Sequence, residues 1–321
     1  MNIKTSFLKI LARLKQRGEQ LLVPVIRLSK KLVLPGFDGI SIYEVSLFFY
    51  RGITKSSLNL RASAISFDFI MALTPGVLFL FTLIPYLPIP GLEQTVMDNI
   101  RTALPKNAFL TIQSTIEDVM SRSHRGLLSM GFLLSIFFAS NGMMTAIRAF
   151  NHSVLVIETR SGFRVRMLSL LLVLLVTLMM IVAAALQILS YWIIDLVGNM
   201  VVLSPFWLKV WFLLIKYLIY LALLLSVFSI IYYLAPAKRG MFRFISAGST
   251  FATVATIIIL ELFSYFINNF GHYNKVYGSL GTLIVIFLWI NINALILMIG
   301  FELNASIYEA RRTAGLTATE N

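Results

Sequence analysis

Residues 277–304 read YGSLGTLIVIFLWININALILMIGFELN and form the last long apolar stretch of this sequence. About twenty of these residues are apolar and follow one another without a charge, which is long enough for a helix to cross a lipid bilayer. Asn291 and Glu302 interrupt the stretch eleven residues apart. That spacing is close to three turns of helix, so both side chains lie on one helical face. Because a polar face is costly in lipid, we expect this face to meet protein or water.

The composition of the whole chain is that of a membrane protein. Of its 321 residues, 58% are hydrophobic and only 13% are charged, whereas soluble domains carry about a quarter charged residues. The chain has no cysteine and three scattered histidines, which excludes disulfides, a cysteine nucleophile and a histidine-based metal site. No Walker loop, His-Glu-x-x-His motif or Gly-x-Ser-x-Gly elbow occurs. We therefore predict no catalytic residues, no metal, no cofactor and a protein that is not an enzyme.

Six apolar segments are long enough to span a bilayer. Their approximate limits are 62–88, 127–147, 168–197, 208–234, 244–267 and 278–303. Backbone polar groups in lipid need partners within the protein, so each segment is expected to be a helix. The predicted fold is all-α: a polytopic membrane protein whose six transmembrane helices make up a domain over residues 62–303.

Lys and Arg residues gather at the span boundaries expected on one side of the membrane. Twenty of the 27 lie before the first span, after the second, after the fourth or in the tail 304–321. Loops rich in Lys and Arg face the cytoplasm, so both termini are predicted to be cytoplasmic. This topology accounts for the net charge of +13, and no nucleic-acid partner is needed to explain it.

Segments outside the spans are expected to form amphipathic helices. Residues 1–34 carry apolar and basic positions at helical spacing, which is typical of a helix on a membrane surface or of one packed on the protein. Within residues 35–61, Ser41 and Glu44 form a capping-box pattern that predicts an interfacial helix through Ile53. The loop 89–126 has apolar faces on both sides of Pro105, which predict a short helical cap on the outer side.

Ionisable and amide side chains occur inside several spans, where each needs a partner or water. Counted from the helix ends, an outer set that should form a charge cluster is Asp195, Lys216 and Glu261. The inner set is Arg61, Asp68, Arg148 and Glu302, and between the two sets lie Asn141 and Asn291. Two interpretations stay open: these side chains join the helices, or they line a solvated translocation path.

Five motifs in combination resemble the YihY/BrkB family of bacterial inner-membrane proteins, over residues 41–310. They are LRASAISFDFIMALTPGVLFLFTL (60–83), FFASNGMMTAIRAFN (137–151), VIETRSGFRVRMLSLLL (156–172), YLAPAKR (233–239) and the stretch from YGSLG to GFELNA (277–305). The resemblance implies a six-helix protein of the inner membrane with both ends in the cytoplasm. It also brings the family's labels: a mistaken ribonuclease BN assignment, a virulence factor and, for some members, export of lipid or lipopolysaccharide precursors.

The motifs also carry the family's characteristic residues over to this chain. These are Arg61, Asn141, Gly142, Arg148, Glu158, Arg160, Tyr277, Gly278, Gly281, Glu302 and Asn304. Asp68 departs from the family pattern, because an aromatic or other uncharged residue is expected at that position. A family-wide role for Asp68 is therefore in doubt.

These features favour a carrier or flippase for an amphiphilic, anionic envelope lipid or precursor, with membrane lipids as its partners. The arginines expected to collect an acidic headgroup at the inner side are Arg148, Arg160, Arg164 and Arg166. The face of Asn291 and Glu302 would line the path, and Lys216 with Glu261 would form an outer gate. The alternative is a non-catalytic scaffold that recruits envelope-assembly proteins through its N-terminal segment and outer cap. Ribonuclease activity is not expected.

Overall fold

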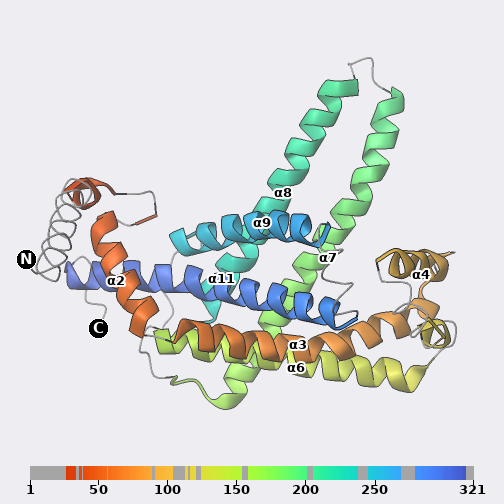
Figure 1. The fold of residues 1–321 in the computed structure, drawn as a ribbon. Helices are drawn as coiled ribbons and strands as arrows, with labels where there is room; N and C mark the ends of the chain where they lie inside the picture. Colours follow the sequence, from red (N-terminus) through yellow and green to blue (C-terminus); the bar gives the residue numbers. More distant parts are fainter. Residues whose placement is uncertain are drawn as a thin grey trace, which may run out of the picture.

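The structure is a computed structural model of the 321-residue chain, and its described part is built of helices (Figure 1). It describes residues 27–33, 36–37, 39–55, 57–88, 91–103, 113–114, 116–120, 124–153, 158–200, 205–237, 245–268 and 279–315. No strand occurs among these residues. Most of the predicted amphipathic segment 1–34 lies outside them, and so do Tyr277 and Gly278.

Six helices in the described part are long and apolar enough to cross a membrane. They are α3 (Leu58–Leu83), α6 (Arg125–Ser153), α7 (Gly162–Met200), α8 (Pro205–Leu234), α9 (Ala247–Asn268) and α11 (Ser279–Thr313). A short 3-10 turn, η1 (Ile84–Tyr86), continues α3. The prediction of an all-α, polytopic membrane protein with six spanning helices is therefore confirmed.

A shorter helix, α2 (Ile42–Lys55), precedes the first span and lies against the last one (Figure 1). It begins at the predicted capping box: the Glu44 amide donates to Ser41 Oγ (3.3 Å), and the Ser41 hydroxyl donates to the Glu44 carboxylate (3.2 Å). Val45 is buried together with Ile307 and Ala310 of α11. Because this last part of α11 packs against α2, the helix continues beyond residue 303, where the sequence predicts a tail.

On the opposite side of the molecule, α4 (Leu92–Ala103) follows the first span (Figure 1). It is a helix in the first half of the predicted cap, the loop 89–126. Residues 113–114 and 116–120 are also helical, and Ile116 and Met120 among them are buried. The other residues between α4 and α6, including 104–112, lie outside the described part.

Helices α3 and α6 pack against each other over much of their length (Figure 1). Small residues allow the close approach: a Cβ at Gly131 would lie only 3.1 Å from the backbone nitrogen of Phe79, and one at Gly142 would touch the ring of Phe69. The rings of Phe79 and Phe132 lie 5.3 Å apart, centroid to centroid. Within lipid, close packing of this kind takes over the role that the hydrophobic effect plays in water.

The buried core of the spanning helices lies mainly at one end of the bundle, which we call the packed end. It is formed by the first turns of α3, α7 and α9 and by the later turns of α6, α8 and α11. Beyond it, none of the described side chains of α7, α8 or α9 within 173–186, 213–227 and 254–266 is buried. These three helices are therefore buried in protein only at the packed end, and we call their other halves, whose described side chains are exposed or partly buried, the uncovered halves.

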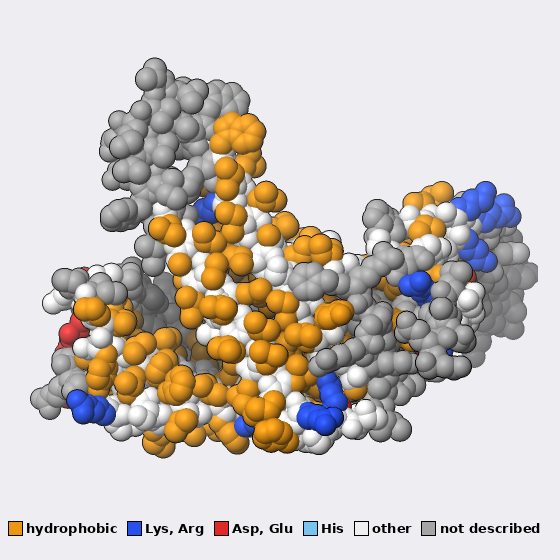
Figure 2. Space-filling view, turned by 180° about the vertical axis from the view of Figure 1, so that it is seen from behind, with side chains coloured by type: hydrophobic (Ala, Val, Ile, Leu, Met, Phe, Trp, Pro, Cys, Tyr) orange, Lys and Arg blue, Asp and Glu red, His pale blue; other side chains and the backbone are white. Residues whose placement is uncertain are grey.

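The uncovered halves of α7 and α8 form a hairpin that projects away from the other helices (Figure 1). In the view of Figure 2, apolar side chains cover most of the described surface, including the described part of the hairpin. Leu174, Met180, Trp211 and Leu218 are among its exposed apolar residues. Such a surface is expected where lipid, rather than water, surrounds a protein.

Candidate functional site at the packed end

A buried ion pair connects three spanning helices at the packed end. Arg61 of α3 donates from Nη1 to the carbonyl oxygen of Ala149 (2.7 Å) and to Ser153 Oγ (2.5 Å), near the end of α6. Its Nη2 lies 3.9 Å from Oε2 of Glu302 on α11, and the two side chains are only 11% and 4% exposed. Gly52 brings the backbone of α2 against Glu302, since a Cβ at Gly52 would lie 2.9 Å from Glu302 Cδ. Arg61 thus caps the carboxyl end of α6 and faces the Glu302 carboxylate.

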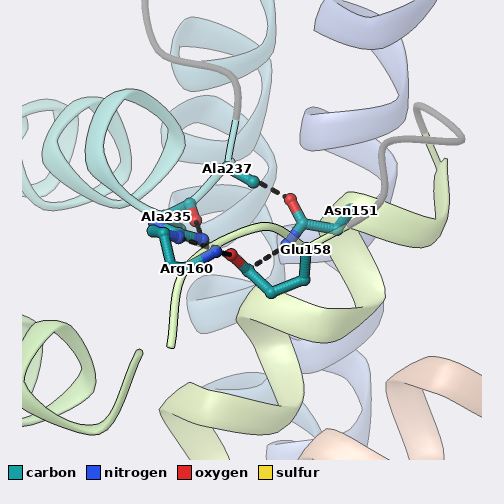
Figure 3. A network of polar contacts seen from close by, with 5 residues as sticks. All are labelled: Asn151, Glu158, Arg160, Ala235 and Ala237. Carbon is teal, nitrogen blue, oxygen red and sulfur yellow. Dashed lines mark hydrogen bonds and ion pairs between the residues drawn. The ribbon is translucent and has the colours of Figure 1, made fainter. Parts of the chain in front are cut away.

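A second polar network joins the α6–α7 connection to the end of α8 (Figure 3). The Arg160 guanidinium donates two hydrogen bonds to the Glu158 carboxylate, both at 2.7 Å, and one to the Ala235 carbonyl (2.9 Å). Asn151 donates to Glu158 (2.7 Å) and accepts from the amide of Ala237 (2.8 Å). The hydrogen bond from Arg160 is the main cause of the lowered pKa of Glu158. The Glu-x-Arg motif therefore fastens two inter-helix connections to each other.

Two glycines allow α9 and α11 to cross in direct contact. A Cβ at Gly248 would lie 2.6 Å from Asn304 Cγ, and a Cβ at Gly300 would lie 2.8 Å from the Gly248 carbonyl oxygen. The Asn304 side chain accepts a hydrogen bond from the Gly248 amide (2.7 Å) and donates one to Ser246 Oγ (2.8 Å). Asn304 therefore satisfies the first turn of α9 from the neighbouring helix.

Aromatic rings fill the centre of the packed end. Phe150 of α6 stacks on Phe301 of α11 with ring centroids 4.1 Å apart, and Tyr232 of α8 lies 5.9 Å from both in edge-on geometry. All three rings are fully buried. The Tyr232 hydroxyl donates to the carbonyl oxygen of Leu297 (2.8 Å). The rings close the space between α6, α8 and α11.

Other predicted polar residues of the spans also contact a neighbouring helix. The pairs are Asn291 with Ser66 (3.1 Å, α11 to α3), Asp68 with Thr145 (2.5 Å, α3 to α6) and Asn141 with Arg166 (2.5 Å, α6 to α7). The guanidinium of Arg166 also lies 4.8 Å from the ring centroid of Phe137. Asn291 and Glu302 both face α3, as their eleven-residue spacing predicts. In this structure, these side chains join helices.

Several predicted site residues lie apart from these contacts. Arg148 and Arg164 are exposed near the packed end. The ion pairs of the described residues do not include one between Lys216 and Glu261, and the outer gate stays a prediction. Glu261 is exposed on the uncovered half of α9, and the ammonium of Lys216 lies 5.9 Å from the ring centroid of Tyr220.

The structure describes the remaining predicted site residues only in part. Asp195 lies on α7, but its side chain is outside the described part. Tyr277 and Gly278 lie wholly outside it, whereas Gly281 is buried in the first turn of α11. No group of His, Asp or Glu side chains that could hold a metal ion occurs among the described residues.

Sequence reasoning did not single out several residues that complete the packed end. They are Asn151, Ser153, Tyr232, Gly248 and Gly300. Asn151 ends one family motif and Tyr232 directly precedes another, so proximity to these motifs was the available signal. The two glycines belong to small-residue patterns that do not reveal which helix they meet.

Known proteins resemble this chain over most of its length. The family model described as virulence factor BrkB matches residues 49–321. The ribonuclease-like protein YfkH of Bacillus subtilis is 31% identical over 252 residues, which cover 78% of this chain and 90% of that protein. A UPF0761 membrane protein of Haemophilus influenzae is 20% identical over 289 residues, covering 84% and 97% of the two chains. No solved structure matches. With its six spanning helices, the chain belongs to the virulence factor BrkB family of membrane proteins.

Proposed function

We propose that the protein is a carrier that moves an amphiphilic, anionic envelope lipid or lipid precursor between the two leaflets of the inner membrane. The observation that supports this proposal is the uneven burial along the spans: α7, α8 and α9 are buried only at the packed end. A carrier that works by alternating access has one side closed while the other side admits its cargo. The uncovered apolar halves would let acyl chains stay in lipid while the headgroup moves along the protein.

Two exposed arginines support an anionic headgroup. Arg148 on α6 and Arg164 in the first turn of α7 lie near the packed end, which the distribution of Lys and Arg assigns to the cytoplasm. A basic residue near an anionic membrane surface contributes about 1 kcal/mol of attraction. Arg160 and Arg166 are already held by Glu158 and Asn141. We therefore assign collection of the headgroup to Arg148 and Arg164.

Reconstitution in liposomes tests the proposal. A fluorescent anionic phospholipid analogue is placed in one leaflet, and a membrane-impermeant quencher reports its transfer to the other leaflet. We expect the wild-type protein to accelerate transfer over protein-free liposomes. The double variant Arg148→Gln/Arg164→Gln should slow transfer of the anionic analogue more than that of a zwitterionic one. Arg101→Gln, an exposed arginine on α4, is the matched control. Transfer by the wild type at the protein-free rate would contradict the proposal.

Opening of the packed end can be followed with single cysteines, since the chain has none of its own. Ser229 of α8 is 1% exposed at the packed end, and Ser229→Cys replaces only an oxygen by a sulfur. This cysteine should resist a small maleimide without cargo and react when lipid is being carried. Ser226→Cys, one turn away and less buried, should react under both conditions. Protection of Ser229→Cys throughout transport would argue against opening at this end.

A non-catalytic scaffold for envelope assembly is the second candidate. The observation that favours it is that Asn141, Asn291 and Asp68 bond to neighbouring helices, as expected of side chains that only hold a bundle together. Asn291→Leu separates the two functions. A carrier should lose lipid transfer in this variant, whereas a scaffold should keep its biological function. Removal of residues 1–34 should have the opposite effects: a scaffold should lose its biological function, whereas a carrier should keep lipid transfer.

A further inference from the structure

Glu302 is a buried acidic side chain where four helices meet. Its side chain is 4% exposed. It belongs to α11 and is enclosed by Gly52 of α2, Arg61 of α3 and the end of α6. A carboxylate removed from water needs close charge-assisted hydrogen bonds, because its desolvation costs several kcal/mol. The contacts of Glu302 therefore decide how well its ionised form is stabilised.

The positive charge beside Glu302 belongs to Arg61, which makes its close hydrogen bonds to α6. Arg61 directs Nη1 to Ala149 and Ser153 on α6 at 2.7 and 2.5 Å, while its Nη2 remains 3.9 Å from Glu302 Oε2. Charge-assisted hydrogen bonds are normally about 2.7–2.9 Å long, so the contact with Glu302 is only a loose ion pair. Glu302 Oε2 is buried and has no hydrogen-bond partner among the described residues.

The Glu158–Arg160 pair of the same chain provides an internal comparison. Its two hydrogen bonds are both 2.7 Å long, and its carboxylate lies 27% exposed in a connection outside the spans. The more deeply buried carboxylate, Glu302, thus lies farther from its arginine partner, at 3.9 Å against 2.7 Å. A structural ion pair would be expected to show the reverse, because burial raises the need for close pairing.

The groups around Glu302 are few in the described part. Arg61 faces it from α3, His152 lies near it on α6, and the Ser153 hydroxyl of α6 makes a hydrogen bond to its carboxyl group. From α2 it meets Gly52, which has no side chain, and the neighbouring Arg51 is exposed. When Glu302 is an anion, its attraction to Arg61 ties α11 to α3 and α6. When Glu302 is protonated, Arg61 keeps its bonds to α6, and that attraction to α11 is lost.

We propose that Glu302 is a proton-binding site, and that its protonation releases α11 from Arg61 and allows the packed end to open during lipid transport. This inference rests on the proposed carrier function and assigns protons as its coupling ion. In each cycle, one proton forms an O–H bond with the Glu302 carboxylate and is later released from it. No other bond forms or breaks. Gly52 contributes because its missing side chain lets α2 cover the carboxylate and close it to solvent.

Transport experiments test the coupling. In liposomes in which the wild type transfers the anionic lipid analogue, we expect an imposed pH difference to change the rate, and a pH-sensitive dye to report accompanying proton movement. Glu302→Gln mimics the protonated state, so both responses should be lost while slow, pH-independent lipid transfer continues. Glu309→Gln, which changes an acidic residue of α11 whose side chain is 43% exposed, should respond as the wild type does. A wild-type rate that ignores the pH difference, or a full response in Glu302→Gln, would overturn the inference.

A chemical probe tests the site without any variant and without transport. A hydrophobic carbodiimide reacts with protonated, buried carboxyl groups, and mass spectrometry locates the product. We expect Glu302 of the wild type to be modified at low pH and protected at high pH. If Glu302 is not modified at any pH at which the protein stays folded, the inference is wrong. Absence of lipid transfer together with pH-dependent modification would instead refute the carrier and leave the proton site standing.

Discussion

Replacing Gly248 by alanine should loosen the crossing of α9 and α11. The new methyl group would overlap the carbonyl oxygen of Gly300 and lie 2.6 Å from Asn304 Cγ, whereas carbon atoms in contact lie about 3.5–4.0 Å apart. The two helices must therefore separate by roughly 1 Å, since both neighbours belong to α11 and one of them is backbone. This movement would also stretch the 2.7 Å hydrogen bond from the Gly248 amide to Asn304.

The size of the effect follows from these contacts. Forcing a methyl group into a packed region costs about 1–3 kcal/mol, and weakening one hydrogen bond adds about 0.5–1.5 kcal/mol. Alanine recovers up to about 1 kcal/mol through its better helix propensity. We therefore expect Gly248→Ala to lower the free energy of unfolding by about 1–4 kcal/mol.

Unfolding of the purified protein in mixed micelles measures this change. Increasing the fraction of a denaturing detergent gives an unfolding curve, which is read by tryptophan fluorescence and by far-ultraviolet circular dichroism. Gly126→Ala is the matched control, because a Cβ at this helical position would have nothing within 4 Å. Its stability should equal or exceed that of the wild type. If Gly248→Ala unfolds at the same detergent fraction as Gly126→Ala, the close crossing does not limit stability and the reasoning fails.

Two further predictions concern the network at the end of α8. Arg160 lowers the pKa of Glu158 from its ordinary value of 4.5, so the stabilisation is present above pH 4.5 and is lost as the pH falls through the lowered value. Glu158→Gln should remove this acid-dependent part of unfolding, measured by circular dichroism over a pH series. Asn151→Leu should cost about 1–3 kcal/mol, because it leaves the Ala237 amide without its acceptor and removes one of the hydrogen bonds to Glu158. In contrast, Asn293→Leu should be nearly neutral in the same unfolding assay, since among the described residues the Asn293 side chain donates to the Trp289 carbonyl of its own helix and to no other helix.

Features that depend on neighbouring residues in the chain could be predicted. The six spans follow from apolar length, and the start of α2 follows from Ser41 and Glu44, whose hydrogen bonds close within one turn. The common face of Asn291 and Glu302 follows from the helical repeat. The pair of Lys216 and Glu261 stays a prediction, because depth in the membrane gives the height of a residue along its helix, but neither the direction of its side chain nor its neighbour.

The polar contacts of the packed end show what could not be predicted from the sequence alone. Helical period and composition are enough to place Arg61, Glu158, Arg160, Glu302 and Asn304 near one side of the membrane, because both are local properties of the chain. They do not show that Arg160 bonds to Glu158 and α8. Nor do they show that Arg61 lies closer to its acceptors on α6 than to the Glu302 carboxylate. These choices depend on which helices become neighbours, and residues far apart in the chain decide that through close packing and inter-helix hydrogen bonds. Only the folded arrangement therefore distinguishes the firmly paired carboxylate of Glu158 from the buried carboxylate of Glu302, whose basic partner lies 3.9 Å away.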